Sequence, residues 1–203
     1  ASVDYDNDLA RNMDKLTYLS PVFSGFQAGI SYTPDNGAAD PSANGADNTA
    51  GVQSDIYELA ARYEGQINNV GVILGAGYTG ASQEANLAGA DDYAEWNVGA
   101  DLDIGAFGLG AVYTENNNSL STEDTNETWV VGADYTTGPF KIGASYLNNE
   151  EDAGTDTETD RYTAGVIYTY GPGMTFRGSV GYTQEDVSDV DATTVTVGTQ
   201  VKF

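Results

Sequence analysis

The sequence of 203 residues contains no cysteine and no histidine. Without cysteine there is no disulfide framework and no thiolate metal site, and without histidine the commonest general base and metal ligand is missing. Enzymes built on a Ser-His-Asp or Cys-His arrangement are therefore excluded. Basic residues are also scarce, with 7 Lys and Arg against 31 Asp and Glu and a formal net charge of −24. Such a charge repels phosphates and argues against nucleic acid as a partner.

Long hydrophobic runs are missing as well. No stretch approaches the roughly 18 apolar residues that a transmembrane helix needs, so hydropathy alone predicts a soluble protein. The strands of a membrane barrel, however, need only about 9 to 11 residues of alternating character. The opening residues, "ASVDYDNDLA", lack the basic and apolar regions of a signal peptide. We therefore expect any export signal to lie outside this sequence or to have been removed.

The sequence is rich in glycine and tyrosine, and its apolar and polar residues alternate with a period of two. With 25 Gly, 14 Tyr and few sustained runs of helix formers, the composition favours an all-β protein. The connections between the predicted strands alternate between short turns rich in Gly and Pro and long polar loops, which predicts an antiparallel up-and-down sheet. The eleven segments that alternate with period two lie approximately at residues 14–20, 26–33, 54–64, 69–79, 92–104, 106–115, 127–136, 139–148, 160–170, 174–184 and 192–203.

The alternation separates an apolar face from a polar face. In the second segment, for example, Phe26, Ile30 and Tyr32 share one side, and Gln27 and Ser31 share the other. Four charged residues fall on the apolar side, but they lie at the strand ends next to the long loops, which is consistent with the lipid headgroup region of a membrane: Asp14, Asp55, Asp92 and Glu127. The charged residues well inside the segments all fall on the polar face: Lys15, Glu58, Arg62, Glu64, Glu95, Asp101, Asp103, Asp134, Lys141, Arg161, Arg177 and Lys202.

Aromatic residues at both ends of the apolar face favour lipid over the core of a soluble β-sandwich, which also alternates. In the strands that leave short turns, a phenylalanine begins the apolar face and a tyrosine closes it about 20 Å further along. That span is comparable to the apolar band between two aromatic girdles of a membrane barrel. The predicted girdle comprises Phe26, Tyr32, Tyr78, Trp96, Phe107, Tyr113, Trp129, Phe140, Tyr146, Phe176 and Tyr182.

The number of strands is odd, whereas single-chain barrels of the bacterial outer membrane have an even number. The first predicted strand begins at the long-loop side and the last one ends at the short-turn side. We therefore expect an odd number of further strands to precede this sequence.

Several stretches resemble the C-terminal portion of outer-membrane general-diffusion porins of the alphaproteobacterial type. They are "DKLTYLSPVFSGFQAGISYTPD", the strand ends "GASY", "GAVYT" and "GVIYT", and the terminal "VGTQVKF". The resemblance implies a transmembrane antiparallel up-and-down β-barrel of sixteen strands, of which residues 14–203 would supply strands 6 to 16 as one barrel domain. The N-terminal third of that family is not matched.

The resemblance also implies roles for individual residues. Residues 1–13 would be the tail of a constriction loop folded into the pore, carrying Asp4, Asp6, Asp8 and Arg11. Phe203 would be the aromatic signal read by the barrel-assembly machinery. Parity along the strands, rather than the resemblance, predicts that the charges of the polar face other than Glu64 line the pore: Lys15, Glu58, Arg62, Glu95, Asp101, Asp103, Asp134, Lys141, Arg161, Arg177 and Lys202.

Two interpretations of the inward basic residues remain open. They could pair with neighbouring acids such as Glu58 and Asp134, or they could face acidic residues of the constriction loop such as Asp4. Opposite charges across a constriction create a transverse field that orients polar solutes.

Apparent chemical motifs in the sequence do not predict an enzyme or a cofactor. "GAGYTG", Gly75 to Gly80, matches a dinucleotide fingerprint, but no helix signal follows it. Asp101 and Asp103 are neighbours on one face rather than a pair flanking a scissile bond. The acidic loops contain no lysine or arginine and predict solvated charge, with weak Ca²⁺ bridging to lipopolysaccharide as the alternative.

The sequence thus predicts a passive diffusion channel for small hydrophilic solutes and ions in a bacterial outer membrane. The alternative is a non-conducting structural or adhesive surface barrel. We expect a homotrimer in contact with outer-membrane lipid and lipopolysaccharide, with extracellular long loops and a periplasmic C-terminus. The strong negative charge predicts a modest preference for cations.

Overall fold

A computed structural model describes residues 9–10, 13–35, 53–84, 88–120, 125–152, 156–187 and 190–202. The described residues form eleven β-strands and include no helix long and apolar enough to cross a membrane. The strands are β1 (Leu16–Leu19), β2 (Phe26–Asp35), β3 (Gln53–Ile67), β4 (Val70–Gln83), β5 (Tyr93–Ile104), β6 (Phe107–Asn116), β7 (Asn126–Thr137), β8 (Phe140–Glu151), β9 (Thr157–Gly171), β10 (Met174–Glu185) and β11 (Val190–Val201).

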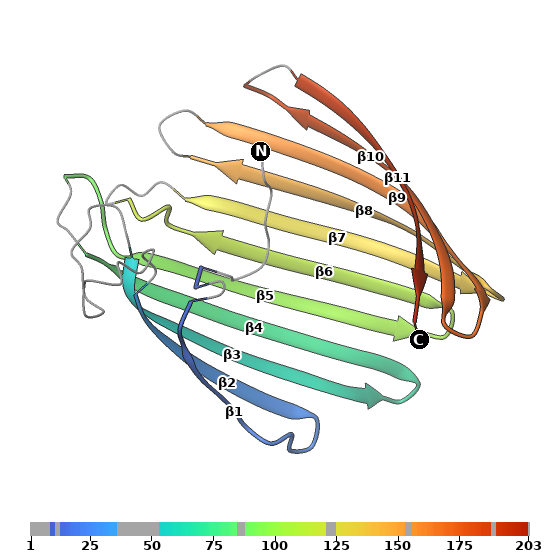
Figure 1. The fold of residues 1–203 in the computed structure, drawn as a ribbon, viewed down its shortest axis with the longest axis horizontal. Coiled ribbons are helices and arrows are strands. Elements are labelled where there is room, and N and C mark those ends of the chain that lie inside the picture. The colour runs from blue at the N-terminus through green and yellow to red at the C-terminus, as the bar shows by residue number, and fades with distance from the viewer. Residues whose placement is uncertain are drawn as a thin grey trace.

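All eleven strands belong to one antiparallel sheet whose spatial order is the order of the chain (Figure 1). Each strand pairs with the next one, from β1 at one edge to β11 at the other. Short connections of residues 20–25, 68–69, 105–106, 138–139 and 172–173 alternate with the long ones, as predicted. All short connections therefore lie at one end of the strands, the short-turn end, and all long loops lie at the opposite, long-loop end.

The short turns use residues that tolerate positive φ. Gly25 has a φ of +87° in the connection before β2, and its carbonyl oxygen accepts a hydrogen bond of 2.8 Å from the backbone N–H of Glu64. Asn68 supplies a φ of 55° in the two-residue turn between β3 and β4. Residues with this freedom let adjacent strands reverse within two residues, which fixes the register of each hairpin.

The registers give the sheet two chemically distinct faces. Directly paired residues lie on the same face, so Phe26 shares a face with Tyr63, and Gln27 shares the other with Arg62. We call the face of Phe26 the apolar face and the face of Gln27 the polar face. Large side chains of the apolar face are widely exposed, among them Phe26 at 61% and Ile142 at 52%.

The described residues contain almost no buried apolar core. Their buried apolar residues are Ala10, Ile56, Val72, Ala81 and Leu147. A soluble sandwich packs two sheets face to face and buries the facing side chains. The single sheet with an exposed apolar face therefore excludes the sandwich interpretation, and it confirms the predicted all-β up-and-down class.

The predicted strand ends are wrong by up to four residues, chiefly at the long-loop end, where β4 runs to Gln83 rather than 79. β8 runs to Glu151 rather than 148, and β9 begins at Thr157 rather than 160. Pairing needs only backbone groups, so the ladder continues past the point where apolar alternation stops, as between Asn149 and Thr159. β1 ends at Leu19, and opposite Ser20 the N–H of Ala28 donates to the serine hydroxyl.

Candidate pore wall

The polar face collects the charged residues that the sequence predicts to line a pore. Lys15 and Lys202 flank β1 and β11 on this face, because they alternate with Leu16 and Val201. The registers place the other nine there as well: Glu58, Arg62, Glu95, Asp101, Asp103, Asp134, Lys141, Arg161 and Arg177. Their role in lining a pore stays a prediction.

Three of the basic residues on this face have a carboxylate partner. Lys15 lies 3.4 Å from Glu58, and Lys141 lies 3.1 Å from Asp134. Arg62 lies 2.7 Å from Glu64, two residues further along β3. The interpretation in which inward bases pair with neighbouring acids therefore holds for three of the six.

The charges of the polar face are separated along the sheet. Between Arg62 and Lys141 the chain has no lysine or arginine, so the carboxylates of β5 have no basic residue on β4 to β7 beside them, whereas Asp134 of β7 is paired with Lys141 of β8. From β8 onward the basic residues follow in succession: Lys141, Arg161, Arg177 and Lys202. The wall therefore has an acidic part and a basic part.

A small apolar cluster covers the polar face near the long-loop end. Ala10 and Leu9 pack against Ile56 of β3, Ala81 of β4 and Tyr93 of β5. Ile56 is fully buried beneath them although it lies on the polar face. This contact brings Leu9 and Ala10 onto the polar face. The predicted constriction residues Asp4, Asp6, Asp8 and Arg11 lie outside the described residues, as does Phe203.

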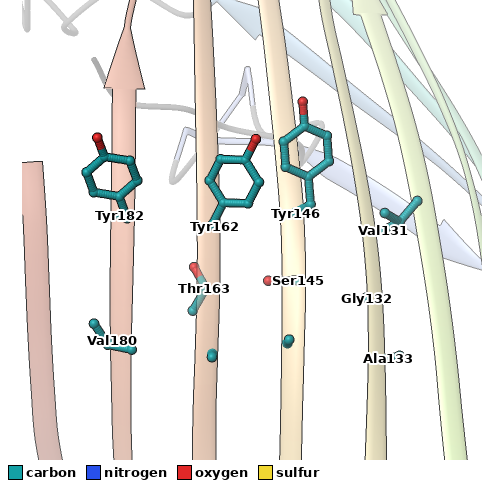
Figure 2. Close-up of a pocket in the computed structure, with 11 residues that line it drawn as sticks. Val131, Gly132, Ala133, Ser145, Tyr146, Tyr162, Thr163, Val180 and Tyr182 are labelled. Carbon is teal, nitrogen blue, oxygen red and sulfur yellow. The ribbon is translucent and has the colours of Figure 1, made fainter. Parts of the chain in front are cut away.

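Tyrosines of the apolar face lie side by side at its long-loop end. Figure 2 shows Tyr146, Tyr162 and Tyr182 on adjacent strands with their hydroxyls towards the same end. Beneath them, small residues such as Ala133 leave a shallow groove of about 670 Å³. A row of amphipathic rings above a narrow apolar surface is typical of a membrane interface.

Several of these tyrosine hydroxyls donate hydrogen bonds to carboxylates. Tyr146 donates to Asp160 at 2.5 Å, and Tyr113 donates to Glu115 at 3.0 Å and to Glu127 at 2.9 Å. The same contact joins Tyr32 to Asp55 and Tyr182 to Asp191. The apolar face thus ends in a band of tyrosines and then a band of carboxylates.

Cross-strand aromatic pairs occur at both ends of the apolar face. Their ring centroids lie 4.7 to 5.1 Å apart, which is within the range of favourable aromatic contact. The pairs are Phe26 with Tyr63, Phe107 with Tyr135 and Phe140 with Tyr168 at the short-turn end, and Tyr32 with Tyr57, Trp96 with Tyr113 and Trp129 with Tyr146 at the other. Tyr78 and Phe176 are exposed on the same face. Their role as a girdle stays a prediction.

Sequence reasoning missed the acceptors Glu115, Asp160 and Asp191. Glu115 follows Tyr113 by two residues on one face, so the spacing alone could have identified that contact. Asp160 and Asp191 lie on neighbouring strands, and finding them requires the register of β8 to β11.

No group of three or more His, Cys, Asp or Glu able to hold a metal ion occurs within the described ranges. Weak Ca²⁺ binding by the acidic loops stays a prediction. The glycines of "GAGYTG" lie within β4, where the backbone is extended.

Solved structures with the same fold are outer-membrane porins. The anion-selective porin from Comamonas acidovorans is similar with a TM-score of 0.73 and 16% identity, over 98% of this chain and 65% of that one. A porin refined at 1.8 Å has a TM-score of 0.67 and 19% identity, over 93% of this chain and 61% of that one. The trimer form of OmpT from Vibrio cholerae has a TM-score of 0.60 and 17% identity, over 92% of this chain and 64% of that one. No curated protein matches the chain by sequence.

These likenesses define a porin-like β-barrel fold, of which the described sheet is one continuous part. The family of Gram-negative porins matches residues 1–198, which is nearly the whole chain. The chain therefore belongs to the Gram-negative porin family, and the outer membrane is the location that this family implies. It spans slightly less than two thirds of the length of the porin structures just described.

Proposed function

We propose that the protein forms a passive, water-filled diffusion channel for small hydrophilic solutes and ions. The observation that carries this proposal is the contrast between the two faces of one continuous sheet. The apolar face exposes side chains such as Phe107 and Val197, while the polar face holds ionised residues. Only a barrel with lipid outside and water inside gives each face the solvent it requires.

In this channel the polar face lines the pore and the apolar face contacts outer-membrane lipid. Residues 1–13 form part of a loop on the pore side, which the packing of Leu9 and Ala10 against Ile56 supports. The long loops are extracellular, because they are the polar and acidic ends of the sheet, and the C-terminus is periplasmic. A homotrimer is the proposed assembly. The trimer form of a structurally similar porin supports it.

Bulk ion selectivity follows from the net charge of −24. A negatively charged lumen enriches mobile cations, so the channel prefers cations modestly. The transport itself requires no cofactor and no chemical step, because solutes move down their own gradients.

Single-channel recording in a planar bilayer tests the proposal, using the protein purified in its native assembly. Steps of nanosiemens scale are expected. Insertion of the protein is verified by protease protection. If inserted protein gives no current steps, the result would instead support a non-conducting surface barrel.

A further inference from the structure

The polar face of β8 to β11 differs in charge from the rest of the wall. Its carboxylates, within the described strands, are confined to the long-loop ends of β8 and β10, at Glu151 and Glu185. Below these ends the face carries basic residues, together with many serine and threonine hydroxyls, such as those of Ser145 and Thr163. In a chain with so few basic residues this is a concentrated basic surface.

Three of its basic residues have no carboxylate partner in the described part of the chain: Arg161, Arg177 and Lys202. Arg177 donates a hydrogen bond to the side-chain oxygen of Gln200, which is neutral. Lys141 is paired with Asp134. The charge of Arg177 is therefore uncompensated next to an ion pair, and the net charge of Lys141, Asp134 and Arg177 together is positive.

A hollow of about 340 Å³ lies in this part of the wall. Lys141 and Arg177 border it on the short-turn side, where both pair with Ile167. The next row of paired residues towards the long loops begins at Asp134 of β7, which also lines the hollow and is paired with Lys141. The row then crosses the hollow with small side chains: Gly143, Gly165, Ser179 and Thr196.

The two glycines keep the hollow open. A Cβ atom on Gly165 would lie 3.1 Å from the carbonyl oxygen of Gly178 and 3.2 Å from the Cβ of Ser179. One on Gly143 would lie 3.2 Å from the Cβ of Asp134. Larger residues at either position would fill the space between the basic residues and the hydroxyls.

The lining selects a solute by its chemistry. A guanidinium presents a planar fork of donors that matches carboxylate or phosphate oxygens, and the Lys141 ammonium offsets the charge of the Asp134 carboxylate at the edge of the hollow. The hydroxyls of Ser179 and Thr196 can exchange hydrogen bonds with hydroxyl groups of the same solute. The volume is at the small end of the range for small-molecule sites.

We propose that this hollow is a binding site for small anions that also carry hydroxyl groups, of which sugar phosphates are the representative class. The proposal rests on the proposed pore, since the solute reaches the hollow through the lumen. Bulk cation preference and local anion binding coexist, because the first follows from total charge and the second from the basic part of the wall.

The test uses the native assembly in a planar bilayer with glucose 6-phosphate as the probe. We expect transient blockades of the ion current that glucose at the same concentration does not cause. Blockades should shorten as salt is raised, because the Debye length falls from about 10 Å at 0.1 M to about 3 Å at 1 M.

Arg177→Gln removes the uncompensated charge while retaining an amide, and it should reduce the affinity for glucose 6-phosphate about two- to fivefold, as expected for an exposed charge contact. The matched control is Arg62→Gln, which removes the same charge from β3, where Glu64 is the partner. We expect it to change the affinity by less than about twofold.

Each remaining outcome is decisive. Normal conductance without blockade by glucose 6-phosphate would overturn the anion site and leave the channel proposal intact. An equal loss in both variants would also overturn it, since a diffuse field rather than a local site would then act. Absence of any conductance from inserted protein would overturn the channel and the site together.

Discussion

Lys141 and Arg177 lie on opposite sides of Ile167, one on β8 and the other on β10. Adjacent strands are about 4.8 Å apart, so the two backbones are separated by roughly 10 Å. No carboxylate occurs on this face between them in the described strands. Two positive charges at this spacing repel each other only weakly in water. Lys141 is paired with Asp134, so Arg177 carries the charge that is available to a solute.

The acidic part of the wall should set the ion preference. Replacing Asp101 and Asp103 together by asparagine removes two negative charges from β5, for which no ion pair is found among the described residues. We expect the reversal potential in a potassium chloride gradient to shift towards anions. The control is Glu150→Gln, which removes one exposed charge from the long-loop end of the apolar face. An unchanged reversal potential in the double variant would contradict the proposed pore lining.

The tyrosine and carboxylate bands should stabilise the barrel rim. Glu115 and Glu127 are directly paired across β6 and β7, and the hydroxyl of Tyr113 donates to both. Without that hydroxyl the two like charges face each other. Tyr113→Phe should therefore lower the free energy of unfolding by about 1 kcal/mol. Thermal unfolding in detergent micelles measures this.

Tyr135→Phe is the matched control for the rim, because no hydrogen bond from the Tyr135 hydroxyl is found among the described residues. It should change the unfolding temperature much less. Equal effects of the two substitutions would show that the carboxylate contacts contribute nothing.

The turn before β2 should not tolerate a side chain at Gly25. A Cβ atom there would lie 2.3 Å from the backbone oxygen of Glu64, and φ is +87°. Because a backbone atom cannot move aside as a flexible side chain can, Gly25→Ala should destabilise the protein by more than about 1 kcal/mol. Gly75→Ala is the control, since nothing lies within 4 Å of its Cβ position. Equal unfolding temperatures for the two variants would contradict this account of the turn.

Much of the fold could be predicted from the sequence because strand alternation and turn residues are both local features of the chain. Alternation along each strand, as from Phe26 to Tyr32, identifies the faces without any knowledge of neighbours. Turn residues such as Gly138 and Pro139 mark the reversals. The strand ends were less predictable, because backbone pairing continues through polar residues such as Asn149 that carry no alternation signal.

The candidate site was predictable as a set of residues but not as an arrangement. Parity alone places Lys141 and Arg177 on one face. That they border the same hollow depends on the registers of β8 to β10, which no local pattern encodes. The carboxylate acceptors of Tyr146 and Tyr182 escaped prediction for the same reason.

Whether the polar face lines a water-filled pore can be tested directly, because the sequence contains no cysteine. Thr163 and Ala164 are neighbours on β9 that face opposite sides of the sheet. Each is replaced by cysteine, and the conductance is followed while a charged, membrane-impermeant thiol reagent is added. We expect that Thr163→Cys loses conductance and that Ala164→Cys does not respond. A response of Ala164→Cys with none from Thr163→Cys would contradict this expectation.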